Sequence, residues 1–105
     1  MLKPTDLLRR LLLSFIAALA LTAQAGAYDD VLIATRNGDV DTVRHLVARG
    51  MDVNTIDPDG NTLLMLAVIH NNPALAEVLL QARASLNKVN PLGETALALA
   101  AFGGH

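Results

Sequence analysis

The sequence repeats itself at an interval of 33 residues, and this period limits the possible folds more than any other feature. Identical residues recur 33 positions apart, as in Asn54 and Asn87, Gly60 and Gly93, Thr62 and Thr95, Leu64 and Leu97, and Ala67 and Ala100. The register extends towards the N-terminus through pairs of apolar residues: Ala34 and Ala67, Val43 and Ala76, Leu46 and Leu79, and Val53 and Leu86. Such a period predicts a stacked solenoid, in which each unit buries its apolar face against its neighbours. Because a solenoid presents an extended surface, the period favours binding over catalysis.

Composition narrows the class of protein further. The chain has 105 residues, enough for one small domain. Apolar residues make up 52% and aromatic residues only 3%, so we expect a core of Leu, Ala, Val and Ile. The absence of Cys excludes disulfides and thiolate metal sites. A net charge of −2 without a visible basic patch argues against nucleic acid as a partner.

The N-terminal segment has the outline of a secretory signal peptide. A positive region with Lys3, Arg9 and Arg10 precedes an apolar run over residues 11–21, and small residues follow. This pattern predicts cleavage after Ala25 or after Ala27. The apolar run is shorter than the roughly 20 residues that a membrane-spanning helix needs, although an uncleaved anchor remains the alternative. Removal of residues 1–25 would change the net charge from −2 to −4, since three basic residues and one acidic residue would be lost.

After this segment the apolar spacing is helical. It predicts a short helix from Val31 that ends near Asn37, and further helices over 40–49, 63–70 and 96–102. Another helix should begin at Pro73, with a buried face made by Leu75, Val78, Leu79 and Leu80. Thr62 and Thr95 are placed to cap helices, and Asn71 tolerates the left-handed conformation that a tight turn needs. The segment Asp57-Pro58-Asp59-Gly60 is a strong turn signal.

These segments resemble ankyrin repeats. Residues 57–67 (DPDGNTLLMLA) and 90–100 (NPLGETALALA) are similar to the opening of a repeat, and residues 38–54 to its closing half. The resemblance implies an all-α ankyrin-repeat solenoid of helix–turn–helix units with extended arms, preceded by a signal-peptide helix. It divides the chain into a signal peptide (1–25) and an ankyrin-repeat domain (26–105), the latter with a capping repeat (28–56), a repeat (57–89) and an incomplete repeat (90–105).

Several positions depart from the family pattern. The histidine of the family's Thr-Pro-Leu-His motif is replaced by Met65 in one unit and by Ala98 in the next. Arg83 stands where the family has a helix-ending glycine, a position where a non-glycine residue costs about 1 kcal/mol. In the first unit Asp29 and Asp30 replace Thr-Pro, which suits an N-terminal capping repeat with a polar outer face.

The last unit is expected to be a partial one. His105 aligns with Asn72, just before a second helix would begin. About three repeats are usually needed for stability, and fewer are complete here. We therefore expect Leu97, Leu99 and Ala100 to face water, and either an incomplete chain or another molecule that covers this side.

Neither a metal site nor catalysis is predicted. For the acidic turn at Asp57 to be an EF-hand loop with Gly60 at its sixth position, acids would be needed at Thr55 and Leu66. No two of His45, His70 and His105 have the helical spacing of a metal pair. We expect no enzyme activity, no cofactor and no metal; a small hydrolase is the disfavoured alternative.

The resemblance implies instead a partner protein, bound at the arm tips and the ends of the inner helices. Carried over by position, the candidate contacts are Pro58, Asp59, Asn61, Ile69, His70, Pro91, Leu92, Glu94, Phe102 and Gly103. Leu92 and Phe102 could instead pack against a neighbouring unit. Bacterial relatives of this layout suggest a periplasmic or secreted protein that protects or scaffolds an envelope enzyme, with only transient membrane contact through the signal peptide. A membrane-anchored scaffold is the alternative.

Overall fold

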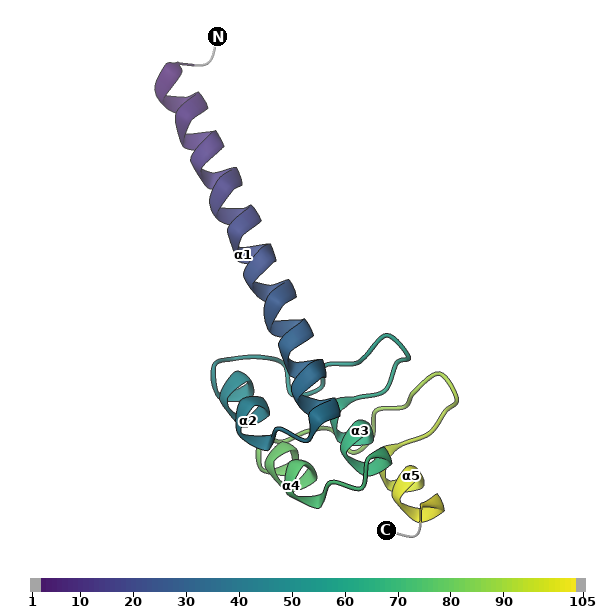
Figure 1. Cartoon of the computed structure of the whole chain (residues 1–105). Coiled ribbons are helices and arrows are strands. Elements are labelled where there is room, and N and C mark those ends of the chain that lie inside the picture. The colour runs from purple at the N-terminus through teal and green to yellow at the C-terminus, as the bar shows by residue number, and fades with distance from the viewer. Residues whose placement is uncertain (1–2, 104–105) are drawn as a thin grey trace.

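In the part of the chain that the computed structural model describes, the secondary-structure elements are all helices, joined by loops. The description covers the backbone of residues 3–103 and their side chains, except those of residues 13–25. The helices are α1 (Pro4–Asn37), α2 (Val40–Ala48), α3 (Leu63–Ile69), α4 (Pro73–Gln81) and α5 (Ala96–Phe102) (Figure 1). The side chains of most of the predicted apolar run and of the cleavage motif up to Ala25 lie outside this description, and so does His105.

Helix α1 is a single element of 34 residues, so the predicted start of a separate helix at Val31 is wrong. No proline interrupts the chain between Pro4 and Asn37, and Gly26 stands between two alanines, the best helix formers. One glycine costs only about 1 kcal/mol in a helix interior, which is too little to end it. The predicted end at Asn37 is confirmed, because Gly38 takes a left-handed φ of 70°.

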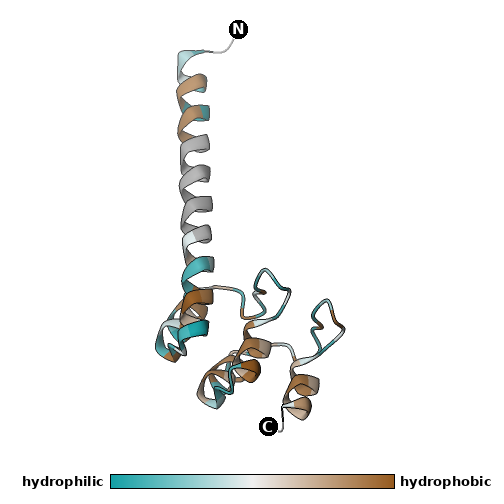
Figure 2. Ribbon diagram, turned by 45° about the vertical axis from the view of Figure 1, so that its right-hand side comes forward, coloured by the Kyte–Doolittle hydropathy of each residue, from teal (hydrophilic) through white to brown (hydrophobic). Residues whose placement is uncertain are grey.

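The helices form two rows. Helix α3 contacts both α1 and α5 in the inner row, and α2 contacts α4 in the outer row. Helix α1 packs antiparallel to α2, and α3 packs antiparallel to α4. Each of these pairs links the inner row to the outer row. The loops before α3 and α5 project to the same side of the stack (Figure 2). The N-terminal part of α1 extends away from the repeats (Figure 1), and the described chain measures 67 × 28 × 20 Å.

The core is built from Val, Leu, Ala and Met. Its buried cluster comprises Val31, Leu32, Ala34, Val43, Leu63, Leu64, Met65, Ala67, Leu75, Leu79, Ala84 and Ala96. The expectation of Ile in the core is wrong for the described residues, because Ile33, Ile56 and Ile69 are all about half exposed.

Two other expectations about burial need correction. Leu80 is 46% exposed, since successive residues of a helix point about 100° apart and Leu79 already faces the core. Leu97 is 73% exposed as expected. Leu99 and Ala100, however, are half-buried, and Leu99 packs against the core cluster from the side of α5 that faces α3.

The predicted helix caps are confirmed. The Thr62 hydroxyl accepts a hydrogen bond from the Met65 N–H at 3.2 Å, and the Met65 sulfur accepts one from the Thr62 N–H at 3.4 Å. Met65, which stands at the position of the family's histidine, therefore forms a reciprocal pair of hydrogen bonds with Thr62. Thr95 caps α5 through the Ala98 N–H at 3.1 Å, but Ala98 has no side-chain group to return the bond. Asn71 adopts a φ of 53°, as the turn before α4 requires.

Arg83, just after α4, has a left-handed φ of 66°. Replacing it measures the free-energy cost of a non-glycine residue at this position. We expect Arg83→Gly to raise the free energy of unfolding by about 0.5–1 kcal/mol, since glycine adopts this conformation without the Cβ strain. Urea denaturation of the full chain would measure the change. Arg49, which directly follows α2 and has a φ of −83°, provides the matched control. Arg49→Gly should not stabilise the protein, and an equal gain in both variants would contradict the explanation.

Candidate protein-binding surface

Two loops of the same shape project from the stack, and we call them finger 1 (residues 57–61) and finger 2 (residues 90–94). In finger 1 the Asp57 carboxylate accepts hydrogen bonds from the N–H groups of Asp59 and Asn61, at 3.0 and 2.9 Å. In finger 2 the Asn90 side-chain oxygen accepts the equivalent bonds from Leu92 and Glu94, at 3.1 and 2.9 Å. The shared 33-residue register thus produces two turns with the same internal bonding.

The Asn90 side chain also joins the two fingers. Its Nδ2 group donates to the Asn61 Oδ1 atom of finger 1 and to the Glu94 Oε1 atom of finger 2, both at 3.0 Å. Asn90 is buried, and both its oxygen and its nitrogen are hydrogen-bonded. An amide in this state holds its neighbours in place, because rotation would leave buried polar groups without partners.

Close packing adds to this link. A Cβ atom added to Gly60 would lie 2.5 Å from the Pro91 Cδ atom, so the ring of finger 2 rests against the backbone of finger 1. The Tyr28 hydroxyl on α1 donates to the Ile56 carbonyl at 2.9 Å, and this bond ties the base of finger 1 to the first unit. Between units, the Ser85 N–H donates to the Asn54 side chain at 2.8 Å. The fingers therefore have a fixed spacing and a fixed base.

The structure divides the predicted contact residues into three groups. Pro58, Asp59 and Leu92 lie exposed on the fingers, and Leu92 is 83% exposed. Exposed residues also lie where the inner helices end, namely Ile69, His70, Phe102 and Gly103. Of the remaining residues, Asn61 and Pro91 make the contacts between the fingers described above, and Glu94 bonds to Asn90 within finger 2. Contact of any of them with a partner stays a prediction.

Sequence reasoning identified the fingers but missed the role of Asn90. The signal was present in the spacing, because an Asn four residues before Glu94 can bond both to the turn and to that carboxylate. The bond from Asn90 to Asn61 could not be inferred in this way. It depends on how closely the two units stack.

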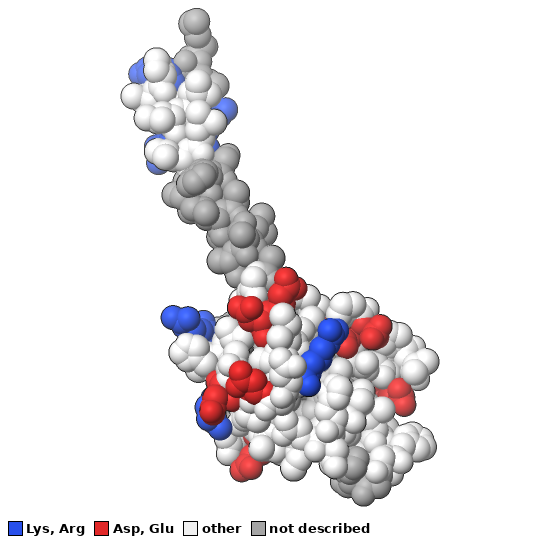
Figure 3. Space-filling view, in the orientation of Figure 1, with Lys and Arg blue, Asp and Glu red and all other residues white. Residues whose placement is uncertain are grey.

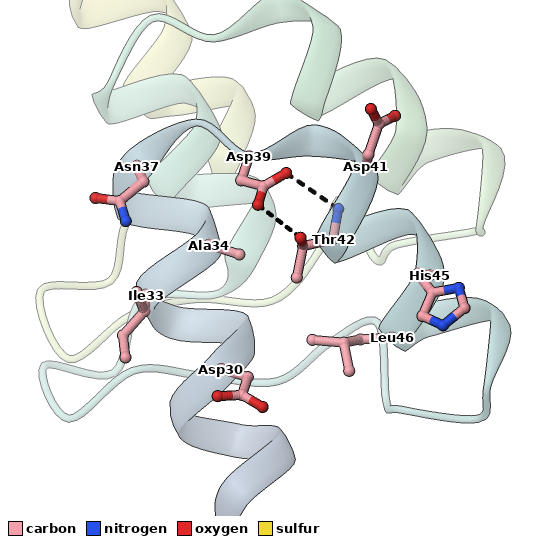
Figure 4. Close-up of a pocket in the computed structure, with 9 residues that line it drawn as sticks. All are labelled: Asp30, Ile33, Ala34, Asn37, Asp39, Asp41, Thr42, His45 and Leu46. Carbon is pink, nitrogen blue, oxygen red and sulfur yellow. Dashed lines mark hydrogen bonds between the residues drawn. The ribbon is translucent and has the colours of Figure 1, made fainter.

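A groove of about 550 Å³ lies between α1 and α2, away from the fingers (Figure 4). We call it the α1–α2 groove; it is lined by Asp30, Ile33, Ala34, Asn37, Asp39, Asp41, Thr42, His45 and Leu46. Asp39 caps α2, accepting from the Thr42 hydroxyl at 2.6 Å and from the Thr42 N–H at 3.2 Å. These two bonds lower the pKa of the Asp39 carboxyl below its ordinary value.

Charge is distributed unevenly over the surface. Figure 3 shows acidic side chains gathered at the base of α1 and over α2. Residues 84–103 carry only Lys88 and Glu94 as charged residues. Among the described residues, no group of three or more His, Cys, Asp or Glu could hold a metal ion. None of the helices in the part searched is long and apolar enough to cross a membrane.

Comparison with known proteins identifies the family. A sequence model of ankyrin repeats in 3 copies matches residues 31–105. The chain belongs to the ankyrin-repeat family. Ankyrin repeats are protein–protein interaction modules, and the family is typically non-enzymatic. The resemblance inferred from the 33-residue period is therefore confirmed at the level of the family.

Three curated relatives illustrate the range of proteins that carry these repeats. The chain is 39% identical over 59 residues to the putative ankyrin repeat protein YahD of Escherichia coli (strain K12), a match that covers 56% of this chain and 29% of the relative. It is 44% identical over 61 residues to the Caenorhabditis elegans homolog of ankyrin repeat and LEM domain-containing protein 1, covering 58% and 9%. It is 34% identical over 76 residues to the human Notch-regulated ankyrin repeat-containing protein, covering 69% and 67%. The matched segment thus spans less than a third of the bacterial relative.

The contact between the fingers can be tested at Gly60. Gly60→Ala combines a left-handed φ of 84° with the clash against Pro91, so it should lower the free energy of unfolding by about 2–4 kcal/mol. Gly93 has a φ of 76° but nothing within 4 Å of its added Cβ, and Gly93→Ala should cost only about 1 kcal/mol. Urea denaturation of both variants would distinguish the cost of a non-glycine residue at a left-handed φ from the cost of the clash with Pro91. Equal losses would show that Pro91 does not hold the fingers together.

Proposed function

We propose that this ankyrin-repeat protein is exported and binds a partner protein through its two fingers and the ends of its inner helices. The observation that carries the proposal is the Asn90 side chain, which fixes finger 2 against finger 1. A surface held in one conformation before binding loses little conformational entropy when a partner docks. The tips that this bond positions are exposed to solvent.

The chemistry of the exposed side chains fits an interface. Leu92 and Phe102 are each 83% exposed, and Ile69, 33 residues before Phe102, is also exposed on the preceding inner helix. Large apolar side chains that are exposed in the free protein are common anchors of protein interfaces. The few charges in residues 84–103 also favour an apolar contact there.

Export is supported by which residues of α1 pack against the repeats. The side chains of residues 3–12 are exposed, and within residues 26–37 of α1 the first buried residue is Val31. Tyr28, which bonds to the base of finger 1, lies beyond both predicted cleavage sites. Cleavage after Ala25 or Ala27 would therefore keep these contacts. Asp29 and Asp30 would then fall in the first turn of the shortened helix, where negative charge is stabilised by the helix dipole.

The more specific form of the proposal is a periplasmic or secreted bacterial protein that protects or scaffolds an envelope enzyme. It rests on resemblance to bacterial proteins of this layout. A membrane-anchored scaffold is the second candidate. It is favoured by the continuity of α1 and by the exposure of Leu7, Leu8, Leu11 and Leu12 near its N-terminus.

The two candidates differ in the mass of the exported protein. If the signal peptide is removed, intact-mass spectrometry of the protein from a periplasmic extract of a bacterial expression host should give a chain that begins at Gly26 or Tyr28. A lysine substitution in the apolar run, Leu12→Lys, should reduce processing, because a charge disrupts that run. Retention of Met1 in the wild-type protein would contradict cleavage and favour the anchored form.

The binding surface can be tested by crosslinking the tagged protein in the cell envelope and identifying what is captured. The double variant Leu92→Ala and Phe102→Ala should capture its main partner at least about fivefold less efficiently, as expected for the loss of interface anchors worth about 1 kcal/mol or more. Leu80→Ala is the matched control, since Leu80 is exposed on α4 in the outer row. Unchanged capture by the double variant, with a normal circular dichroism spectrum, would refute this surface.

A further inference from the structure

The α1–α2 groove differs from the equivalent place in the second unit, and the repeat register shows how. Three residues of the groove, Asp30, Thr42 and His45, have counterparts 33 positions later in Leu63, Leu75 and Val78. All three counterparts are buried, because the first unit stacks against the second through the contacts of α1 with α3 and of α2 with α4. In the first unit these three positions are polar. The groove therefore lacks the fully apolar surface that packs between stacked ankyrin units.

The floor of the groove nevertheless remains apolar. It is supplied by Ile33 and Ala34 of α1 and by Leu46 of α2, and Ile33 is 55% exposed (Figure 4). The outer face of a capping unit is normally polar, so a polar residue would be expected at the position of Ile33. An exposed isoleucine on a concave floor therefore points to an apolar group of another molecule.

The rim of the groove is acidic. Asp30, Asp39 and Asp41 are among its nine lining residues, and no Lys or Arg is. Asp41 pairs with Arg44 at 2.8 Å, so its charge is offset, and the acidic character of the rim comes from Asp30 and Asp39. In Figure 4 the Asp30 and Asp39 carboxylates lie towards opposite ends of the groove, with the apolar floor between them.

We propose that the α1–α2 groove binds a short basic segment of a partner protein. One large apolar side chain of the segment rests on Ile33, Ala34 and Leu46, and Lys or Arg side chains on either side of it face Asp30 and Asp39. Charge complementarity selects this occupant, because an acidic or neutral segment would meet uncompensated carboxylates. The groove is separate from the fingers and gives the protein a second contact surface. This inference does not depend on the proposed function.

A synthetic peptide provides the probe. A fluorescein-labelled peptide with a central Leu between two pairs of Arg should bind the full chain saturably in fluorescence anisotropy, and less tightly as salt is raised. The same peptide with Glu in place of Arg should not bind. Asp30→Asn and Ile33→Thr should each weaken binding by about two- to fivefold, the range expected for one exposed charge or one partly buried apolar contact.

Matched variants control for general effects of charge and hydrophobicity. Glu77→Gln removes one exposed carboxylate and Leu80→Thr one exposed apolar side chain, both on α4 and outside the groove. Both should bind the peptide as the wild type does, and so should the finger variant Leu92→Ala. Thermal denaturation should show that Asp30→Asn and Ile33→Thr remain folded, since both residues are exposed.

Three results would overturn the proposal. The first is a lack of saturable binding by the arginine peptide. The second is equal binding of the glutamate peptide, which would show that charge does not select the occupant. The third is equal weakening by Asp30→Asn and Glu77→Gln, which would show that the net charge of the protein attracts the peptide without the groove.

Discussion

Burial of α3 on nearly every side is the constraint on which the rest of the structure depends. Five consecutive residues of this helix, Leu63 to Ala67, are between 0% and 7% exposed. A helix of seven residues is too short to be stable by itself in water, so its contacts with α1, α4 and α5 must hold it in place. Residues that face both neighbouring units cannot be polar without hydrogen-bonding partners, and the sequence LLMLAVI meets this requirement. Helix α3 is therefore stable only together with its neighbours.

The stack also explains why the two candidate surfaces differ. The fingers leave the stack on one side, and the unit-to-unit spacing that α3 imposes brings Asn90 within bonding distance of Asn61. The α1–α2 groove belongs to the first unit, where positions that are apolar in the second unit become Asp, Thr and His. One surface thus arises from the repetition, and the other from a departure from it.

Much of the fold could be predicted because it depends on local chemistry. Thr62 and Thr95 cap their helices as expected, Gly60 and Gly93 occupy left-handed turn positions, and the ends of α1 and α5 lie where the pattern placed them. The errors concern properties that a residue's own neighbours in sequence do not decide. Leu80 is exposed because α4 packs against α2 and α3 through its other side, where Leu75 and Leu79 are buried. Ile33, Ile56 and Ile69 each remain about half exposed. The continuity of α1 was missed because the change in composition near residue 26 indicates a change of role without a break in the helix.

The sequence by itself determined the architecture, the family and the two fingers. Each of these follows from the 33-residue period together with turn and cap residues that act over four or five positions. Only the tertiary structure decided how the fingers are joined and where the groove lies. The amide of Asn90 meets Asn61 across 29 residues, and Asp30 lies near Leu46 because two helices pack side by side. Such distances are set by the packing of side chains between units, and no spacing within one unit contains them.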